Sequence, residues 1–222
     1  MRLPGFGSGT DTRRERRHMV RKDLVGRGIS DKRVLAAMAS VRREYFVPDT
    51  TKHLAYADQP LPIGCEQTIS QPYIVALMTE EAHITRHSNV LEVGTGTGYH
   101  TAVIADIARH VWSVERIAVL SDEARLRLEE IGVENVTLIV GDGAQGHLAA
   151  APFDAIIVAA AAPNSPKPLL GQLAIGGRLV IPVGDRAIQT LYSVERTSDG
   201  LVNHTAGSCR FVPLVSPQAF QD

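Results

Sequence analysis

The segment that decides the fold is "LEVGTGTGYHTAVIA", Leu91–Ala105, in which an apolar run meets three glycines and then a helical pattern. The apolar residues up to Val93 predict a strand, and the residues after Gly98 predict a helix over residues 99–108. Glycines at such a turn let a ligand approach the backbone at the amino end of the helix. The segment therefore predicts a ligand-binding turn within an α/β fold.

The same alternation of strands and helices continues downstream. Further strands are predicted over residues 110–115, 136–140, 153–160 and 176–184, with a helix over residues 118–130. Short apolar runs separated by helices indicate a parallel sheet that is covered on both faces. After residue 185 the alternation stops, and residues 188–196 and 207–215 predict strands near one edge. The predicted fold class is therefore α/β, a doubly wound Rossmann-like sheet with C-terminal edge strands.

Helices and a long loop precede this sheet. Residues 1–18 are glycine-rich and then basic, so we expect a mobile basic extension there. An apolar stripe that includes Val34 and Met38 predicts an N-terminal helix, with Ser30 placed to cap it. A second helix is predicted over residues 72–81, after a loop-rich segment.

Composition narrows the class of protein. The chain has 222 residues, of which 44% are hydrophobic, and its formal net charge is -1, which is typical of a globular domain without a nucleic-acid partner. No apolar run is long enough to cross a bilayer, so no membrane association is expected. Cys65 and Cys209 fit free thiols in a reducing cytoplasm. The histidine spacing gives no pair of ligands on one helix face, so no metal is predicted.

The glycine spacing distinguishes between two classes of cofactor. Gly94, Gly96 and Gly98 follow a G-x-G-x-G pattern, and Tyr99 stands where a dinucleotide fingerprint has its third glycine. The Glu92 carboxylate would repel a pyrophosphate and attract an ammonium or a sulfonium group. This disfavours a nicotinamide dehydrogenase and predicts S-adenosyl-L-methionine as the cofactor.

Two further acids stand at predicted strand ends, where open α/β sheets bind ligands. Glu115 can accept hydrogen bonds from the ribose hydroxyls, and Asp142 can accept one from the adenine amino group. The predicted cofactor-binding residues are Glu92, Gly94, Thr95, Gly96, Gly98, Glu115, Asp142 and Gly143.

Several motifs together resemble one enzyme family. "VWSVERI", "GDGAQG", "RFVPLV" and above all "PLPIGCEQTISQPYIVALMTE" are similar to those of protein-L-isoaspartate O-methyltransferases, over about residues 19–216. The resemblance implies one methyltransferase domain over residues 19–222. Its parts are N-terminal helices with the substrate loop (19–88), a cofactor-binding core (89–184) and C-terminal strands (185–222).

The resemblance also implies an activity. It is methyl transfer from S-adenosyl-L-methionine to the free α-carboxyl of L-isoaspartyl residues in damaged proteins or peptides, by a cytoplasmic monomer. Ser70 carries over as the catalytic residue, and Thr68, Ile69 and Gln71 are assigned to substrate binding. The "QTISQ" segment would then be a lid over the methyl donor, with "RFVPL" as a wall of the peptide cleft.

Other interpretations stay open from the sequence. Ser70 stands just before Pro72 and could simply cap the helix that begins there. Cys65, Glu66 and His100 depart from the residues that are common in the family. The variation at Cys65 and Glu66 keeps open a carboxyl methyltransferase with a dedicated peptide substrate. A non-catalytic module that binds S-adenosyl-L-methionine is the third alternative.

Overall fold

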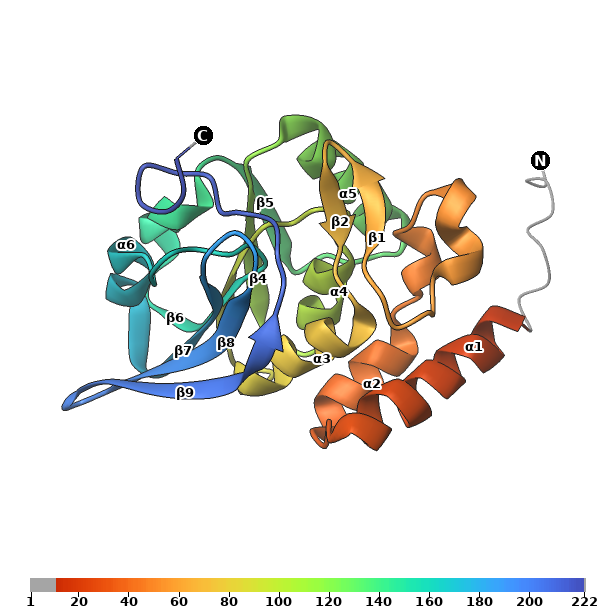
Figure 1. Cartoon of the computed structure of the whole chain (residues 1–222), viewed down its shortest axis with the longest axis horizontal. Helices are drawn as coiled ribbons and strands as arrows, with labels where there is room; N and C mark the ends of the chain where they lie inside the picture. The colour runs from red at the N-terminus through yellow and green to blue at the C-terminus, as the bar shows by residue number, and fades with distance from the viewer. Residues whose placement is uncertain (1–10, 222) are drawn as a thin grey trace.

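A computed structural model describes residues 11–221, and its centre is a seven-stranded mixed sheet (Figure 1). The strands are β3 (Asn89–Val93), β4 (His110–Glu115), β5 (Val136–Val140), β6 (Phe153–Val158), β7 (Leu173–Gly184), β8 (Gln189–Thr197) and β9 (Gly200–Cys209). Their order across the sheet is β5-β4-β3-β6-β7-β8-β9, parallel through β7 and antiparallel from β7 to β9. The predicted doubly wound α/β class is confirmed.

Six α-helices accompany the sheet within the described residues. They are α1 (Asp11–Met19), α2 (Lys32–Ser40), α3 (Pro72–Glu81), α4 (Tyr99–Ala105), α5 (Ala118–Glu130) and α6 (Lys167–Gly171). The helices predicted over residues 72–81 and 118–130 have these bounds. Helix α4 ends three residues earlier than predicted.

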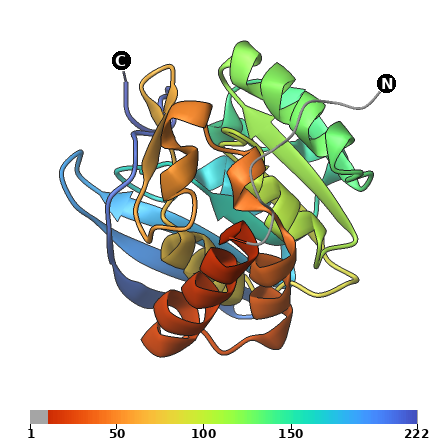
Figure 2. The same cartoon turned by 90° about the vertical axis from the view of Figure 1, so that its right-hand side faces the viewer.

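Alternation along the central strands divides the apolar side chains between two cores. Val90 packs in the core that the N-terminal helices and α4 cover, whereas Leu91 packs in the core on the opposite face. Figure 2 shows the N-terminal helices gathered on one side of the sheet. Because its two faces are covered, the sheet leaves its carboxyl ends as the place for a site.

The N-terminal region is ordered earlier than predicted. Residues 1–10 of the expected extension lie outside the described part of the chain, but α1 is already helical from Asp11. Its Arg16 donates a hydrogen bond to the Tyr56 hydroxyl at 3.1 Å, and Met19 is buried, so packing holds this helix in place. A short π-helical turn, Val20–Leu24, and a 3-10 turn, Val25–Arg27, follow it.

Asp31, rather than the predicted Ser30, caps α2. Its side chain accepts hydrogen bonds from the backbone of Arg33 and Val34. Ser30 instead donates its backbone N–H and its hydroxyl to Glu80 of helix α3.

A second, two-stranded sheet stands where a loop was expected. Strand β1 (Leu61–Gly64) pairs antiparallel with β2 (Gln67–Ile69). The turn between them places Cys65 and Glu66 at φ 49° and 57°, in the left-handed region that few residues other than glycine adopt. Two 3-10 turns, Arg43–Tyr45 and Asp49–Leu54, precede this hairpin, and two more, Gly143–Gln145 and Leu148–Ala150, lie between β5 and β6.

The last strand also differs from its prediction. It begins at Gly200 rather than residue 207, because a tight turn after Thr197 lets β9 pair with β8 at once. Beyond Cys209 the chain leaves the sheet and runs along Ala161, which bonds the backbone of Val212 and Leu214. This segment, residues 211–221, is called the C-terminal segment below.

Candidate active site

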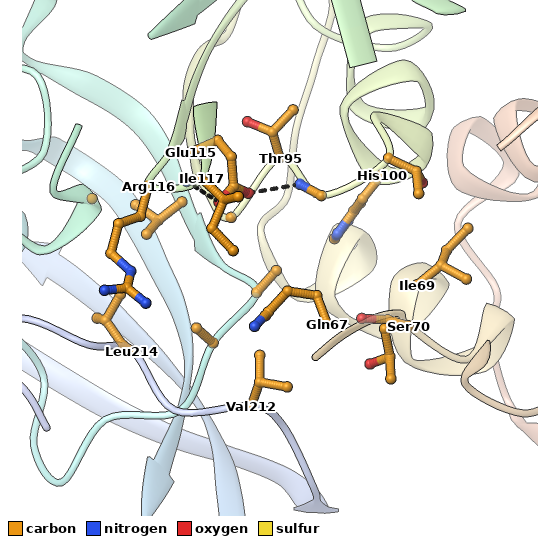
Figure 3. Close-up of a pocket in the computed structure, with 18 of the residues that line it drawn as sticks. Gln67, Ile69, Ser70, Thr95, His100, Glu115, Arg116, Ile117, Val212 and Leu214 are labelled. Atoms are coloured by element: carbon orange, nitrogen blue, oxygen red, sulfur yellow. Dashed lines mark hydrogen bonds between the residues drawn. The ribbon is translucent and has the colours of Figure 1, made fainter. Parts of the chain in front are cut away.

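A cavity of about 340 Å³ lies at the carboxyl ends of the central parallel strands (Figure 3). Most of its lining comes from the turn after β3, the residues after β4, the β1–β2 hairpin and the C-terminal segment, with further residues from α4 and from the loops after β5, β6 and β7. Its volume falls in the range of sites for small molecules and cofactors. The sheet edge and segments that are distant in sequence therefore form one site.

The glycine turn is one wall of this cavity. Gly94, Gly96 and Gly98 have φ angles of 95°, 53° and 88°, so each needs the freedom of glycine. Gly94 and Gly96 line the cavity together with Thr95. Gly98 does not line it; a Cβ there would lie 3.3 Å from Ala124, so its role is to let the turn pack on α5. Of the three glycines in this turn, Gly94 and Gly96 therefore line the cavity, and Gly98 is structural.

Glu115 lies where it was predicted to lie, at the end of β4 and in the cavity wall. Its Oε2 accepts a hydrogen bond from the Gly96 N–H at 2.9 Å, and its Oε1 accepts one from the Ile117 N–H at 3.0 Å (Figure 3). A carboxylate has about four acceptor positions, so capacity remains for ligand hydroxyls. Glu115 thus ties the glycine turn to the end of β4.

Glu92 does not reach the cavity. It is fully buried, and its Oε2 accepts hydrogen bonds from Thr101 at 2.5 Å and Ser113 at 2.6 Å. Its Oε1 has no partner among the described residues. Burial raises the pKa of this carboxyl to about 7, against the lowering effect of the two hydroxyls. Alternation along β3 places Glu92 on the Val90 face, under α4, so it supports the turn from behind.

Asp142 also turns away from the cavity. Its Oδ1 accepts from the Ala144 N–H at 3.0 Å, and its Oδ2 accepts from the Ser216 hydroxyl at 2.8 Å. The C-terminal segment thereby covers this acid. The next residue, Gly143, does line the cavity, and a Cβ there would come within 2.3 Å of Val93. Only glycine fits this close approach between β3 and the segment after β5.

The hairpin supplies the opposite wall. Thr68, Ile69 and Ser70 line the cavity, and Gln67 points into it (Figure 3). Ser70 is half-buried, and its hydroxyl has no hydrogen-bond partner among residues 11–221. It does not cap α3, because Asp58 Oδ1 accepts from the Tyr73 N–H at 3.0 Å in that role. The capping interpretation of Ser70 is therefore wrong, and its hydroxyl is free to bind a ligand.

Gln71 faces a different cavity, of about 390 Å³. Its Nε2 donates to the Asp58 backbone oxygen at 3.0 Å and to Asp58 Oδ2 at 2.7 Å. Arg27 pairs with the same carboxylate at 2.6 Å, so Asp58 connects the start of α3 to the turn that ends at Arg27. The two cavities share four lining residues, namely Thr68, Ser70, Ala159 and Val212.

Three groups of cavity residues were missed or only partly foreseen. The "RFVPL" stretch was predicted as a cleft wall, and its Val212 and Leu214 do line the cavity. Arg186, between β7 and β8, was not predicted and has no local motif that would indicate it. His100 stood out only as a departure from the family, yet it too lines the cavity.

Neither metal chemistry nor a disulfide emerges from the described residues. No group of three or more His, Cys, Asp and Glu side chains there could hold a metal ion. Cys65 and Cys209 are both free thiols, and burial raises the pKa of Cys209 to about 11. Within residues 11–221, no helix has the length and apolar character that crossing a bilayer requires.

Comparison with known proteins agrees with this geometry. Residues 14–219 match the family model of protein-L-isoaspartate(D-aspartate) O-methyltransferase. A protein-L-isoaspartate O-methyltransferase from Trichlorobacter lovleyi is 49% identical over 207 residues, which are 93% of this chain and 95% of that protein. One from a Picosynechococcus species is 53% identical over 199 residues, 90% of this chain and 89% of that protein.

Solved structures give the same result. A protein-L-isoaspartate O-methyltransferase superposes with a TM-score of 0.82 at 28% identity, covering 92% of this chain and 67% of its own. A Plasmodium falciparum protein assigned to the same activity, in complex with S-adenosyl-L-homocysteine, has a TM-score of 0.76 at 26% identity and covers 89% and 98%. The chain belongs to the protein-L-isoaspartate(D-aspartate) O-methyltransferase family.

Proposed function

We propose that the cavity between the glycine turn and the hairpin is where S-adenosyl-L-methionine and an isoaspartyl carboxylate meet. The chain is an S-adenosyl-L-methionine-dependent enzyme that methylates L-isoaspartyl residues for protein repair. One observation carries the assignment of the site: Glu115 and the free Ser70 hydroxyl face the same cavity from opposite walls.

The residues of the first wall fit the cofactor. Gly94, Gly96 and Gly143 line the cavity with backbone, and a Cβ at Gly143 would clash with Val93 of β3. Glu115 retains acceptor positions for the ribose hydroxyls. When bound, the cofactor supplies an electrophilic methyl group on a sulfonium and leaves as a neutral thioether. Glu92 and Asp142, which were predicted to contact it, act through the turn and the C-terminal segment instead.

The residues of the second wall fit the methyl acceptor. A carboxylate is ionised near neutral pH, so it needs no general base to attack. The Ser70 hydroxyl donates a hydrogen bond to one carboxylate oxygen and so fixes the direction of the other. Thr68 and Ile69 line the same wall, and Val212 closes it from the C-terminal side. Alignment and the removal of water supply most of the acceleration, for which proximity alone can contribute about 7–11 kcal/mol.

Repair follows from the product. The methyl ester is a better electrophile than the carboxylate, so the neighbouring backbone nitrogen attacks its carbonyl carbon and methanol leaves. The resulting succinimide adds water and opens partly to normal aspartate. No residue of the chain is needed after methyl transfer.

The partners and the place of action are also proposals. We expect a monomer in the cytoplasm that acts on isoaspartate-containing proteins and peptides. The two free thiols support a reducing compartment. Sedimentation at several protein concentrations tests the monomer.

The test of the site uses transfer of labelled methyl from S-adenosyl-L-methionine to paired peptides, one with L-isoaspartate and one with L-aspartate. We expect base-labile label on the isoaspartyl peptide only. Normal cofactor binding without label on either peptide would contradict a general repair site and favour a dedicated peptide substrate.

A further inference from the structure

The imidazole of His100 is a polar group in the cavity that the mechanism above does not use. His100 lies in the first turn of α4, is only 7% exposed and lines the cavity. In Figure 3 its ring points into the cavity, between the glycine turn and the hairpin wall. Its place is thus between the Glu115 end and the Ser70 end of the site.

The hydrogen bonds of Thr79 determine which ring nitrogen carries the proton. The Thr79 hydroxyl donates its one hydrogen to the Val75 carbonyl oxygen at 2.7 Å. The same oxygen lies 2.9 Å from His100 Nε2, so it must act there as the acceptor. His100 therefore carries its proton on Nε2, and Nδ1 has an unshared electron pair.

This Nδ1 atom is available to a ligand. It has no hydrogen-bond partner among the described residues, and it is not among their buried polar atoms that lack both a partner and solvent access. Burial lowers the pKa of the imidazole to about 3, so the ring is neutral at physiological pH. A neutral acceptor at this position favours an N–H donor and disfavours a carboxylate.

We propose that His100 Nδ1 accepts a hydrogen bond from the α-ammonium group of the cofactor, with Thr79 as the residue that positions the ring. Beyond the ribose, toward the methyl acceptor, the α-ammonium is the one N–H donor that S-adenosyl-L-methionine has. The carboxylate of the cofactor is thereby directed away from His100. This inference rests on the cofactor placement proposed above.

The experiment measures calorimetric affinity for S-adenosyl-L-homocysteine and for the analogue in which hydrogen replaces its α-amino group. A charge-assisted hydrogen bond of about 1.5–3 kcal/mol corresponds to about 10- to 150-fold, so the wild type should prefer S-adenosyl-L-homocysteine by that factor. His100→Leu should lose this preference, while its affinity for the analogue stays within about twofold of wild type. His100→Asn is the matched control, because an amide oxygen can stand near the Nδ1 position and keep part of the preference.

Nitrogen NMR of the histidine side chains gives an independent test. The His100 resonances should show the Nε2–H tautomer in the free protein, and the Nδ1 resonance should move when S-adenosyl-L-homocysteine binds. Thr79→Val removes the acceptor that selects the Nε2–H form, so both tautomers should appear while S-adenosyl-L-homocysteine still binds. An Nδ1–H tautomer in the free wild type would overturn the proposal.

The two proposals fail in different ways. If the wild type does not bind S-adenosyl-L-homocysteine at all, the proposed site is wrong. If it binds normally and His100→Leu keeps the full preference over the analogue, only the role of His100 is wrong.

Discussion

The wall of the cavity that carries Glu115 and the glycine turn grows out of neighbouring parallel strands, whereas the hairpin wall with Ser70 lies outside the large sheet. Backbone bonds from the sheet run directly into the first wall, such as Gly94 N–H to the Val114 oxygen at 2.8 Å. The second wall depends on Asp58 and on the C-terminal segment. The difference predicts that the first wall controls cofactor affinity and the second controls peptide turnover.

The largest effect is expected at the first wall. Glu115→Ala removes the acceptor of two backbone N–H groups and of the ribose hydroxyls, so cofactor affinity should fall by about 100-fold. Calorimetry with S-adenosyl-L-homocysteine measures it, and Glu115→Gln, which keeps one acceptor oxygen, should lose less. An unchanged affinity for S-adenosyl-L-homocysteine would show that the first wall does not bind the cofactor.

The second wall should respond to the loss of its support. Asp58→Ala releases Gln71, the Tyr73 N–H and Arg27, which should lower the free energy of unfolding by about 3 kcal/mol. Denaturant unfolding measures this loss, and KM for the isoaspartyl peptide should rise. Asp49→Ala, at an exposed ion pair, is the control. A larger effect on cofactor affinity than on peptide KM would break the division between the walls.

Glu92 makes the first wall sensitive to pH. Its pKa is raised from 4.5 to about 7 in the folded chain, so its stabilising contribution is complete below pH 4.5 and is lost as the pH rises through about 7. The loss should amount to about 3 kcal/mol of unfolding free energy in the cofactor-free protein. Glu92→Gln should remove this pH dependence, and Glu129→Gln on the exposed face of α5 should not. Equal pH profiles for wild type and Glu92→Gln would show that folding does not raise the pKa of Glu92.

Ser70 gives the sharpest separation of the two walls. Ser70→Ala should reduce kcat/KM for the isoaspartyl peptide by about 30-fold, the effect of one hydrogen bond to a charged group. Cofactor affinity should stay within about twofold, because Ser70 belongs to the hairpin. Ser70→Thr keeps a hydroxyl and should retain part of the activity. Full turnover by Ser70→Ala would exclude a catalytic role.

The smallest of these effects is expected from the bond between the C-terminal segment and Asp142. Ser216→Ala removes the bond from the C-terminal segment to Asp142, which is worth about 1 kcal/mol, so cofactor affinity should fall by about fivefold. Ser198→Ala, in the exposed turn between β8 and β9, is the matched control. If both variants bind equally well, the C-terminal segment does not affect the cofactor side.

Local signals explain what could be predicted. Strand β3, the glycine turn and the start of α4 occupy consecutive residues. Helix α5 has the predicted bounds because no glycine or proline interrupts residues 118–130. Alternation along β3 could also have placed Glu92 on the face of Val90 and away from the ligand. The position of Glu115 followed from the sheet alone.

Long-range contacts explain what could not be predicted. Asp142 meets a serine 74 residues away, and no local pattern announces that bond. The β1–β2 hairpin escaped prediction because its strands are short and its turn uses Cys65 and Glu66 rather than glycine. The Gln71 side chain points away from the cavity because its amide donates to Asp58, 13 residues earlier in the chain.

The position of the C-terminal segment has a consequence during synthesis. Residues 19–210 contain the whole seven-stranded sheet and can begin to pack as the chain emerges from the ribosome. The cavity, however, lacks a wall until residues 212–215 have emerged, and Asp142 lacks its cover until Ser216 has. A nascent chain can therefore acquire its fold before it can hold a methyl donor, because the sheet is complete before residues 212–216 have emerged.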